Sequence, residues 1–287
     1  MQNKNSWTAD LAVDSIARSR PTASPSTDPE LRPVRARKPS RPIQVEHQVD
    51  RRAVLVEDPD LGVRLEPMEF REARMRCSAP WLVAEPSGWA DPWPFPSWSD
   101  CLGLLIIRGH LASRTVIAGR SSLEILGPGD VAQPWCDRRS GAIAGATASW
   151  SALDEVSALV LDRRFQQTAA RWPDLLAEIM NRALRRADRL AADRAVDQMP
   201  KLAERLHLVL WRLGQRFGRV TPEGVRLPVR LSHQHLAELC SAQRPSVSQA
   251  LGVLTRNGQV TKLDSGALVV LPSVDNPPTT QGVSQGR

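Results

Sequence analysis

The sequence predicts an α+β chain in which a β-rich half precedes a mainly helical half. Between residues 103 and 161, short apolar runs alternate with Gly-containing turns, a spacing typical of antiparallel strands. After Arg163 the apolar residues recur every three or four positions, which is the period of an amphipathic helix. The length of 287 residues suits one or two domains.

Both ends of the chain differ in composition from a globular domain. Residues 19–42 are rich in Pro, Ser and Arg and poor in large apolar side chains, and the last stretch, "NPPTTQGVSQGR", has the same character. Segments of this kind cannot bury enough apolar surface to offset the entropy lost on folding. We therefore expect disordered tails over residues 1–52 and 273–287, with the folded chain between them.

The net charge of +7 is unevenly distributed. Residues 1–52 carry 10 basic and 6 acidic groups, residues 53–162 carry 9 and 15, and residues 163–271 carry 18 and 9. A basic C-terminal half suits a module that binds a polyanion such as nucleic acid. Arg-rich helices that are simply well solvated would give the same count.

Several functional classes are excluded by what the sequence lacks. There is no signal-peptide-like or membrane-spanning apolar run, so we expect a soluble, cytoplasmic protein. The four cysteines are scattered without a C-x-x-C pair, which argues against disulfides and metal sites: Cys77, Cys101, Cys136 and Cys240. We expect no cofactor and no enzyme activity, because there is no Gly-rich phosphate loop and His110 has no evident catalytic partner.

The β-rich half is predicted to form a sandwich or barrel. Its apolar runs include Leu104 to Ile107, Thr115 to Ile117 and Leu123 to Leu126. The "GPGD" at 127–130 indicates a turn, because Pro presets φ and Gly permits positive φ. The segment from Trp81 to Trp98 holds four of the nine Trp residues between prolines. We interpret it as irregular structure over a hydrophobic surface, with an aromatic ligand wall as the alternative.

A long helix is predicted over residues 172–197, with Pro173 in its first turn. Five residues recur at spacings of four, three, four and three: Leu176, Met180, Ala183, Ala187 and Leu190. This is the a/d pattern of a coiled-coil seam over about two heptads. We expect a dimer interface there; packing of the helix against its own domain is the alternative. A second amphipathic helix follows Pro200 and ends at Gly218.

The segment from Ser232 to Leu271 is predicted to be helix, tight turn, helix and hairpin. Ser232 is a good N-cap, and "CSAQ" at 240–243 forms the turn. In the second helix Val247, Ala250, Leu251 and Leu254 make a buried stripe, and Asn257-Gly258 ends it. A three-residue loop at 264–266 then joins two short apolar strands. This order of elements is that of a winged helix-turn-helix.

The outward side of the second helix carries small polar residues with no large apolar side chain. Such a face suits insertion into the DNA major groove, where Arg pairs with guanine, Gln pairs with adenine and Ser reaches bases or phosphates. A helical hairpin that merely exposes a polar surface is the alternative. The candidate DNA-binding residues are Ser232, Gln243, Arg244, Pro245, Ser246, Ser248, Gln249 and Arg256.

This segment resembles the C-terminal DNA-binding domain of Crp/Fnr-type transcriptional regulators. Upstream, "GLLIIRGHLASRTVIAGRSSLEILGPGDV" resembles the sensory β-roll of that family, which is like a cyclic-nucleotide-binding domain. The resemblance spans about residues 53–272. It implies a β-roll sensor over 53–162, a linking and dimerisation helix over 163–198, and a winged helix-turn-helix over 199–272. It also implies a bacterial homodimer on a pseudo-palindromic operator, with recognition helices roughly 34 Å apart. RNA polymerase and a small-molecule effector are the further candidate partners.

The resemblance is incomplete at two functional places. The family's recognition helix commonly begins Arg-Glu-x-x-x-Arg, whereas this chain has Arg244-Pro245-Ser246-Val247-Ser248-Gln249. Because Pro245 cannot accept from cytosine, we expect a different operator. The sensor lacks the Gly-Glu pair and the Arg-Ser/Thr of the family's cyclic AMP cassette; "AIAGATAS" stands there, with Arg138 and Arg139 nearby. We expect no control by cyclic AMP in the usual pocket.

A second class of function competes with DNA binding. The chain could instead be a small-molecule-binding or protein-interaction module whose winged helix docks a protein partner. Binding to duplex DNA that weakens steeply with salt, with a slope near −0.9 per phosphate neutralised, distinguishes the two hypotheses.

Overall fold

The computed structural model describes residues 45–46, 50–86, 101–134 and 146–272. The expected tail over 273–287, most of the expected tail over 1–52, and both Arg138 and Arg139 lie outside these ranges. Residues 87–98 of the Trp-rich segment also lie outside the described ranges. Residues 51 and 52 do not belong to a tail as expected. They belong to the strand Arg51–Ala53, which pairs with Ser78–Pro80, and Arg51 also donates to both carboxylate oxygens of Asp162 at 2.6 and 3.1 Å.

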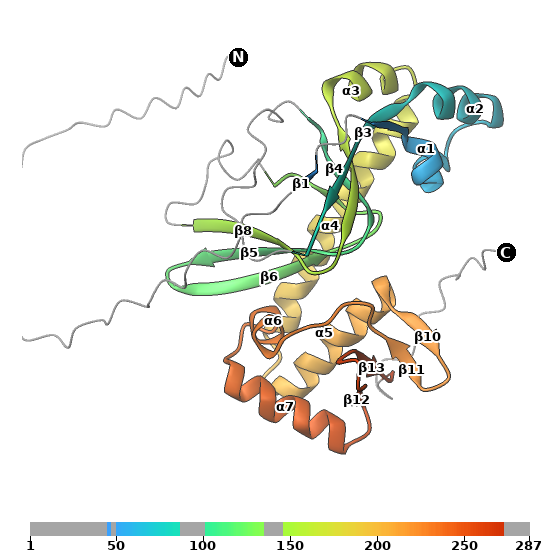
Figure 1. Cartoon of the computed structure of the whole chain (residues 1–287). Helices are drawn as coiled ribbons and strands as arrows, with labels where there is room; N and C mark the ends of the chain where they lie inside the picture. The colour runs from blue at the N-terminus through green and yellow to red at the C-terminus, as the bar shows by residue number, and fades with distance from the viewer. Residues whose placement is uncertain (1–44, 47–49, 87–100, 135–145, 273–287) are drawn as a thin grey trace, which may run out of the picture. The chain divides into compact units, whose positions relative to one another are not determined.

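The β-rich half consists of two antiparallel sheets (Figure 1). In the larger one β3 (Ser78–Ala84), β9 (Val156–Leu161) and β4 (Gly103–Arg108) are central. The short strands β1 (Val45–Glu46), β2 (Arg51–Ala53) and β7 (Val131–Ala132) flank them. The smaller sheet has the order β6-β5-β8, formed by Arg120–Leu126, Leu111–Ile117 and Ala146–Ala152. A buried cluster that includes Leu104, Leu111 and Trp150 takes side chains from both sheets.

One sequence prediction for this half is corrected, and three elements were missed. Residues 81–84 of the Trp-rich segment are not irregular but belong to β3, where Trp81 pairs with Leu159 of β9. Three helical segments before β3 were not predicted: α1 (Val54–Glu57), the 3-10 helix η1 (Pro59–Gly62) and α2 (Pro67–Arg76). The predicted turn at 127–130 is confirmed, because Asp130 N–H donates to Gly127 O at 3.0 Å and Gly129 has a φ of 83°.

The helical half begins with the short α3 (Arg163–Ala169), capped by the Asp162 side chain. The predicted long helix is α4 (Pro173–Asp197), with Pro173 at its start as expected. Its buried residues, among them Leu175 and Ile179, pack with α3 and the larger sheet in one cluster.

The C-terminal segment forms three helices and a small sheet. The helices are α5 (Leu202–Phe217), α6 (His233–Leu239) and α7 (Arg244–Arg256). The sheet has the order β10-β11-β13-β12, from Arg219–Thr221, Gly224–Arg226, Leu268–Val270 and Val260–Lys262. The first part of the connection between α5 and α6 is the β10–β11 hairpin.

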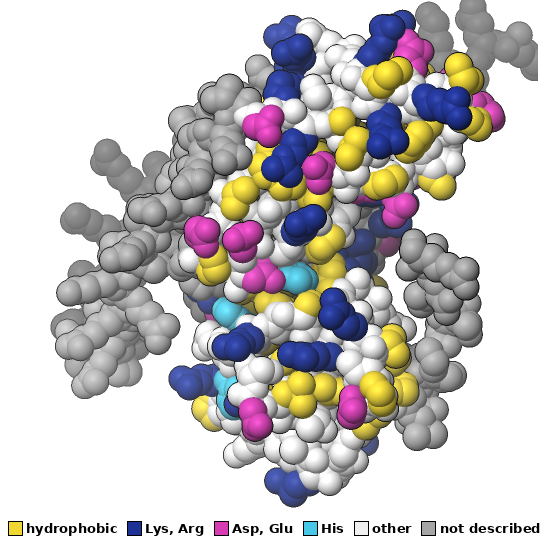
Figure 2. All heavy atoms as spheres, turned by 45° about the vertical axis from the view of Figure 1, so that its right-hand side comes forward, with side chains coloured by type: hydrophobic (Ala, Val, Ile, Leu, Met, Phe, Trp, Pro, Cys, Tyr) yellow, Lys and Arg dark blue, Asp and Glu magenta, His cyan; other side chains and the backbone are white. Residues whose placement is uncertain are grey.

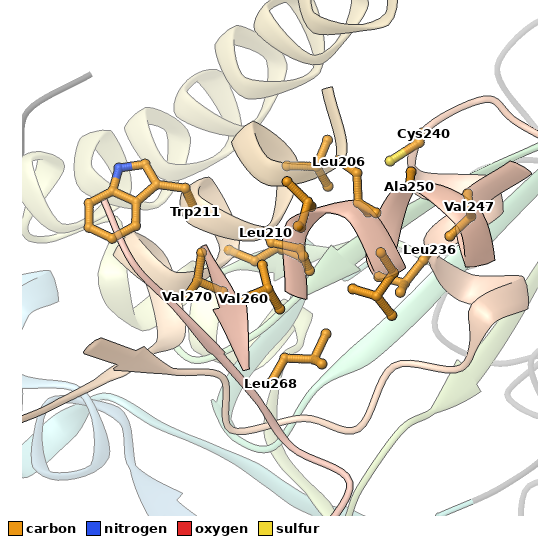
Figure 3. Packing of buried hydrophobic residues seen from close by; sticks show 14 of the residues in the cluster. Leu206, Leu210, Trp211, Leu236, Cys240, Val247, Ala250, Val260, Leu268 and Val270 are labelled. Carbon is orange, nitrogen blue, oxygen red and sulfur yellow. The ribbon is translucent and has the colours of Figure 1, made fainter. Parts of the chain in front are cut away.

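One core joins the elements of this C-terminal segment. Figure 3 shows Leu206, Leu210, Leu236, Val247, Ala250 and Leu268 packed together from α5, α6, α7 and β13. The predicted stripe of α7 is confirmed as buried, at Val247, Ala250, Leu251 and Leu254. Burying this stripe fixes which side of α7 faces outward.

Candidate nucleic-acid interface

Ser232 caps the first helix of the motif, as predicted. Its hydroxyl oxygen accepts from the N–H of His235 at 3.1 Å, and the N–H of Ser232 donates back to Nδ1 of His235 at 3.4 Å. This reciprocal pair is a capping box with His in place of Glu or Gln. The Ser232 oxygen is thus used in the cap, while its hydroxyl proton is available to a phosphate.

The capping arrangement requires a neutral His235. Only an unprotonated Nδ1 can accept from the N–H of Ser232. Burial lowers the pKa of His235, and Arg114 lowers it further, while Glu238 acts in the opposite direction. The cap and the burial of the ring therefore both favour the neutral form of His235.

The turn between α6 and α7 has a left-handed residue at Ser241, with φ of 48°. Gly is the residue that adopts this conformation without strain. Ser241 is held there by its hydroxyl, which donates to Asp197 at the end of α4 at 2.9 Å. The turn places α7 directly after α6 with only four residues between them.

The predicted DNA-contacting residues of α7 lie together on its exposed side. Gln243, Arg244, Pro245, Ser246, Ser248, Gln249 and Arg256 are all exposed. Pro245 is the second residue of the helix, where its missing N–H breaks no intrahelical bond. Arg244, Gln249 and Arg256 make no hydrogen bond or ion pair within the described chain. Their donors and acceptors are available to a partner.

Ser248 differs from these three residues because it is already bonded. Its hydroxyl donates to the carbonyl oxygen of Arg244 at 3.1 Å, and Nδ1 of His233 lies 2.8 Å from Oγ of Ser248. Since the hydroxyl has one proton, the His233 Nδ1–H is then the donor in the second bond. His233 was not in the predicted DNA-binding set, because the bond depends on how α6 and α7 cross.

The C-terminal segment is strongly basic. Residues 199–272 contain ten Lys or Arg and four Asp or Glu residues. Glu238, one of the four, is buried and accepts from Arg114 Nε of β5 at 2.9 Å. Figure 2 shows Lys and Arg side chains spread over the face in view rather than gathered in one patch. The candidate interface on α7 is therefore identified by its exposed polar side chains and not by a local concentration of positive charge.

The predicted seam of α4 is largely uncovered in the single chain. Met180 is 57% exposed, Leu190 is 40% exposed, and Ala183 and Ala187 are exposed, while Leu176 is half-buried. Leu184, also 57% exposed, belongs to the same apolar strip and was missing from the predicted set. A strip of this kind along a 25-residue helix suits packing against another helix.

A small cavity lies between the β6-β5-β8 sheet and α4. It has a volume of about 270 Å³ and is lined by Ser113, Thr115, Ser122, Glu124, Gln133, Trp150, Arg186 and Leu190. Arg186 is the basic residue among these, and it donates to both carboxylate oxygens of Glu124 at 2.8 and 2.7 Å. Its charge is compensated, so the cavity offers no free cation for a phosphate.

No metal-binding group is present among the residues that the structure describes. In the same part of the chain, no helix combines the length and apolarity needed to cross a bilayer. Cys77 and Cys240 are buried, which raises their pKa values to about 11 and about 12 and keeps the thiols protonated.

The capped first helix, the tight turn, the polar α7 and the β12–β13 hairpin together define a winged helix-turn-helix DNA-binding protein. Residues 204–275 match the family model of the Crp-like helix-turn-helix domain, so this domain is present in the chain. The resemblance of this segment to the helix-turn-helix domain of Crp-type regulators is thus confirmed.

The fold is shared with solved structures that cover most of the chain. A cyclic nucleotide-binding domain containing protein from Listeria monocytogenes EGD-e is 16% identical with a TM-score of 0.53, covering 74% of this chain and 96% of its own. A double mutant of CooA from Carboxydothermus hydrogenoformans is 16% identical with a TM-score of 0.50, covering 68% and 84%. These likenesses confirm the predicted α+β fold class. No curated protein matches the sequence.

Proposed function

We propose that this regulator acts as a homodimer that binds a pseudo-palindromic DNA operator through α7. The observation that carries this proposal is the exposed side of α7, where the side chains of Arg244 and Gln249 are free and the opposite side is buried. Arg at the N-terminal end of a groove-inserted helix reaches guanine O6 and N7, and Gln reaches adenine N6 and N7. Ser246 and Arg256 supply further contacts to bases or phosphates.

The second part of the proposal concerns the dimer. The exposed strip of α4, with Met180, Leu184, Ala187 and Leu190, pairs with the same strip of a second copy. An isologous pairing of this kind has twofold symmetry, which matches the symmetry of a palindromic site. We assign residues 53–162, together with the preceding strand residues 51 and 52, to the sensor, 163–198 to the linking helix and 199–272 to the DNA-binding domain.

The third part concerns control. The sensor cavity holds hydroxyl, amide and indole groups around an Arg186 already paired with Glu124. A cyclic nucleotide needs an uncompensated cation for its phosphate. We therefore propose that cyclic AMP does not control this protein through that cavity. RNA polymerase and a different small molecule remain proposed partners, and a cytoplasmic location follows from DNA binding.

Selection of genomic fragments by the purified protein tests the function. The expected result is an enriched motif with two half-sites about one helical turn apart. Affinity for that motif is then measured by fluorescence anisotropy over a series of salt concentrations. The logarithm of the affinity should fall with a slope of about −0.9 for each phosphate contacted. No enriched motif and no duplex binding at low salt would favour a winged helix that docks a protein.

A further inference from the structure

The DNA-binding domain contains a larger cavity that is separate from the exposed side of α7. It has a volume of about 610 Å³ and lies between the first half of α5 and the last turn of α7. The lining residues are Met199, Lys201, Ala203, Glu204, His207, Leu208, Trp211, Val253, Leu254, Asn257 and Gln259. This volume is within the range of small-molecule sites, which is about 300–1,000 Å³.

Helical periodicity explains why α5 forms one wall of the cavity. Glu204, His207, Leu208 and Trp211 recur at spacings of three, one and three, so they share one side of the helix. Figure 3 shows the Trp211 indole turned away from the other labelled core side chains. The ring thus provides an aromatic wall, and Leu208, Val253 and Leu254 add apolar surface.

His207 supplies a buried polar group with a free site. The side chain is 5% exposed and its Nε2 lies 2.8 Å from the carbonyl oxygen of Leu271. A carbonyl only accepts, so Nε2 carries the proton and the neutral ring keeps a lone pair on Nδ1. Within the described chain Nδ1 has no hydrogen-bond partner. Nδ1 is not one of the enclosed polar atoms left without a partner in the described chain, so its lone pair is accessible and an N–H or O–H of a ligand can donate to it.

The charges at the cavity rim compensate each other. Lys201 Nζ lies 2.8 Å from Glu204 Oε1, so the lining carries one cation and one anion in a pair. Asn257 and Gln259 add neutral amides. A lining with this balance favours a neutral molecule, because Glu204 would repel an anion and Lys201 would repel a cation.

We propose that this cavity binds a neutral aromatic molecule that carries an O–H or N–H donor. The ring lies against Trp211 and the apolar side chains, and the donor bonds to Nδ1 of His207. An occupant also contacts Val253, in the helix that carries the candidate DNA-contacting residues, and Asn257, which caps the C-terminus of that helix. The site therefore differs in both place and chemistry from the small cavity between the sensor sheet and α4.

Two probes that differ in a single donor test the proposal. The full-length protein is titrated with 2-naphthol, and separately with 2-methoxynaphthalene, by calorimetry and ligand-detected NMR without DNA. We expect 2-naphthol to bind about tenfold more tightly, because the ether leaves Nδ1 unpaired. In His207→Phe this preference should disappear. Equal binding of the two probes to the wild-type protein, or binding of neither, would overturn the proposal.

Two surface variants keep the test independent of any effect of His207→Phe on folding. Val253 is 36% exposed at the cavity, and Val253→Trp should fill the cavity and weaken 2-naphthol binding by about tenfold or more. Val220 is 78% exposed on β10 and does not line the cavity, so Val220→Trp should leave binding unchanged. If Val253→Trp binds as well as wild type, the site is wrong. Since no DNA is present, the proposed DNA-binding function is not at stake in these measurements.

Discussion

His233 Nδ1 and Ser248 Oγ lie 2.8 Å apart, so the first helix of the motif is tied directly to the exposed side of the second. Because the Ser248 hydroxyl also donates to Arg244 O, its position is fixed from two directions. A side chain held in this way meets DNA with less loss of rotamer freedom. The bond also places an imidazole of α6 at the edge of the proposed interface.

The bond between His233 and Ser248 should contribute to DNA affinity as a coupled pair. We expect His233→Ala and Ser248→Ala each to weaken operator binding, and the double variant to weaken it by less than the sum of the two. A double-mutant cycle by fluorescence anisotropy should give a coupling energy of about 0.5–1 kcal/mol. Strict additivity would show that the contact does not operate in the complex.

Arg244 should be a base-contacting residue. We expect Arg244→Ala to lower affinity for the selected operator by roughly 1–3 kcal/mol and to relax discrimination at one base pair. The measurement is competition binding against operators substituted at each position. Arg120→Ala, an exposed arginine in the β5–β6 hairpin, serves as the control and should change little. An equal loss on random DNA would mean that Arg244 contacts phosphate alone.

The α4 strip should determine the oligomeric state. Placing a carboxylate in the middle of an apolar helix pair buries an unpaired charge, so Ala187→Glu and Leu184→Glu should each yield a monomer. Multi-angle light scattering at micromolar concentration measures this directly. Ala192→Glu, on the same helix but off the strip, should leave the dimer intact. A dimer that persists in Ala187→Glu would place the interface elsewhere.

The features that the sequence predicted well are those set by local periodicity. Val247, Ala250, Leu251 and Leu254 are buried because their spacing puts them on one side of any helix, whatever that helix packs against. Pro173 and Ser232 begin their helices for equally local reasons, fixed φ and a side-chain cap.

The features that prediction from the sequence missed depend on weak local signals or on contacts between distant segments. Helix α2 buries only Ala73, so it has almost no apolar pattern, and its capping box uses Glu66 and Glu69 instead of a Ser or Thr cap. Leu184 was missed because a strict a/d template selects Ala183, although a straight α-helix drifts relative to that template. The acceptor on His207 required knowing that the carbonyl of Leu271, 64 residues away, lies beside the ring.

His235 should make the stability of the motif depend on pH. Burial lowers its pKa in the folded chain, so as pH falls the unfolded state takes up the proton first. Stability is therefore fully present above the ordinary His pKa of about 6.5 and is lost as pH falls through the lower folded value. Protonation also removes the acceptor that completes the Ser232 cap.

The variant His235→Gln separates this effect from other titrations. Gln at this position of a capping box still accepts from the N–H of residue 232, but it does not titrate. We expect the urea midpoint of the wild-type protein to fall between pH 7.5 and pH 5.5, and that of His235→Gln to fall less. His233→Gln, on a different face of α6, is the matched control and should keep the wild-type pH dependence. A fall of equal size in wild type and His235→Gln would assign the acid sensitivity to other groups.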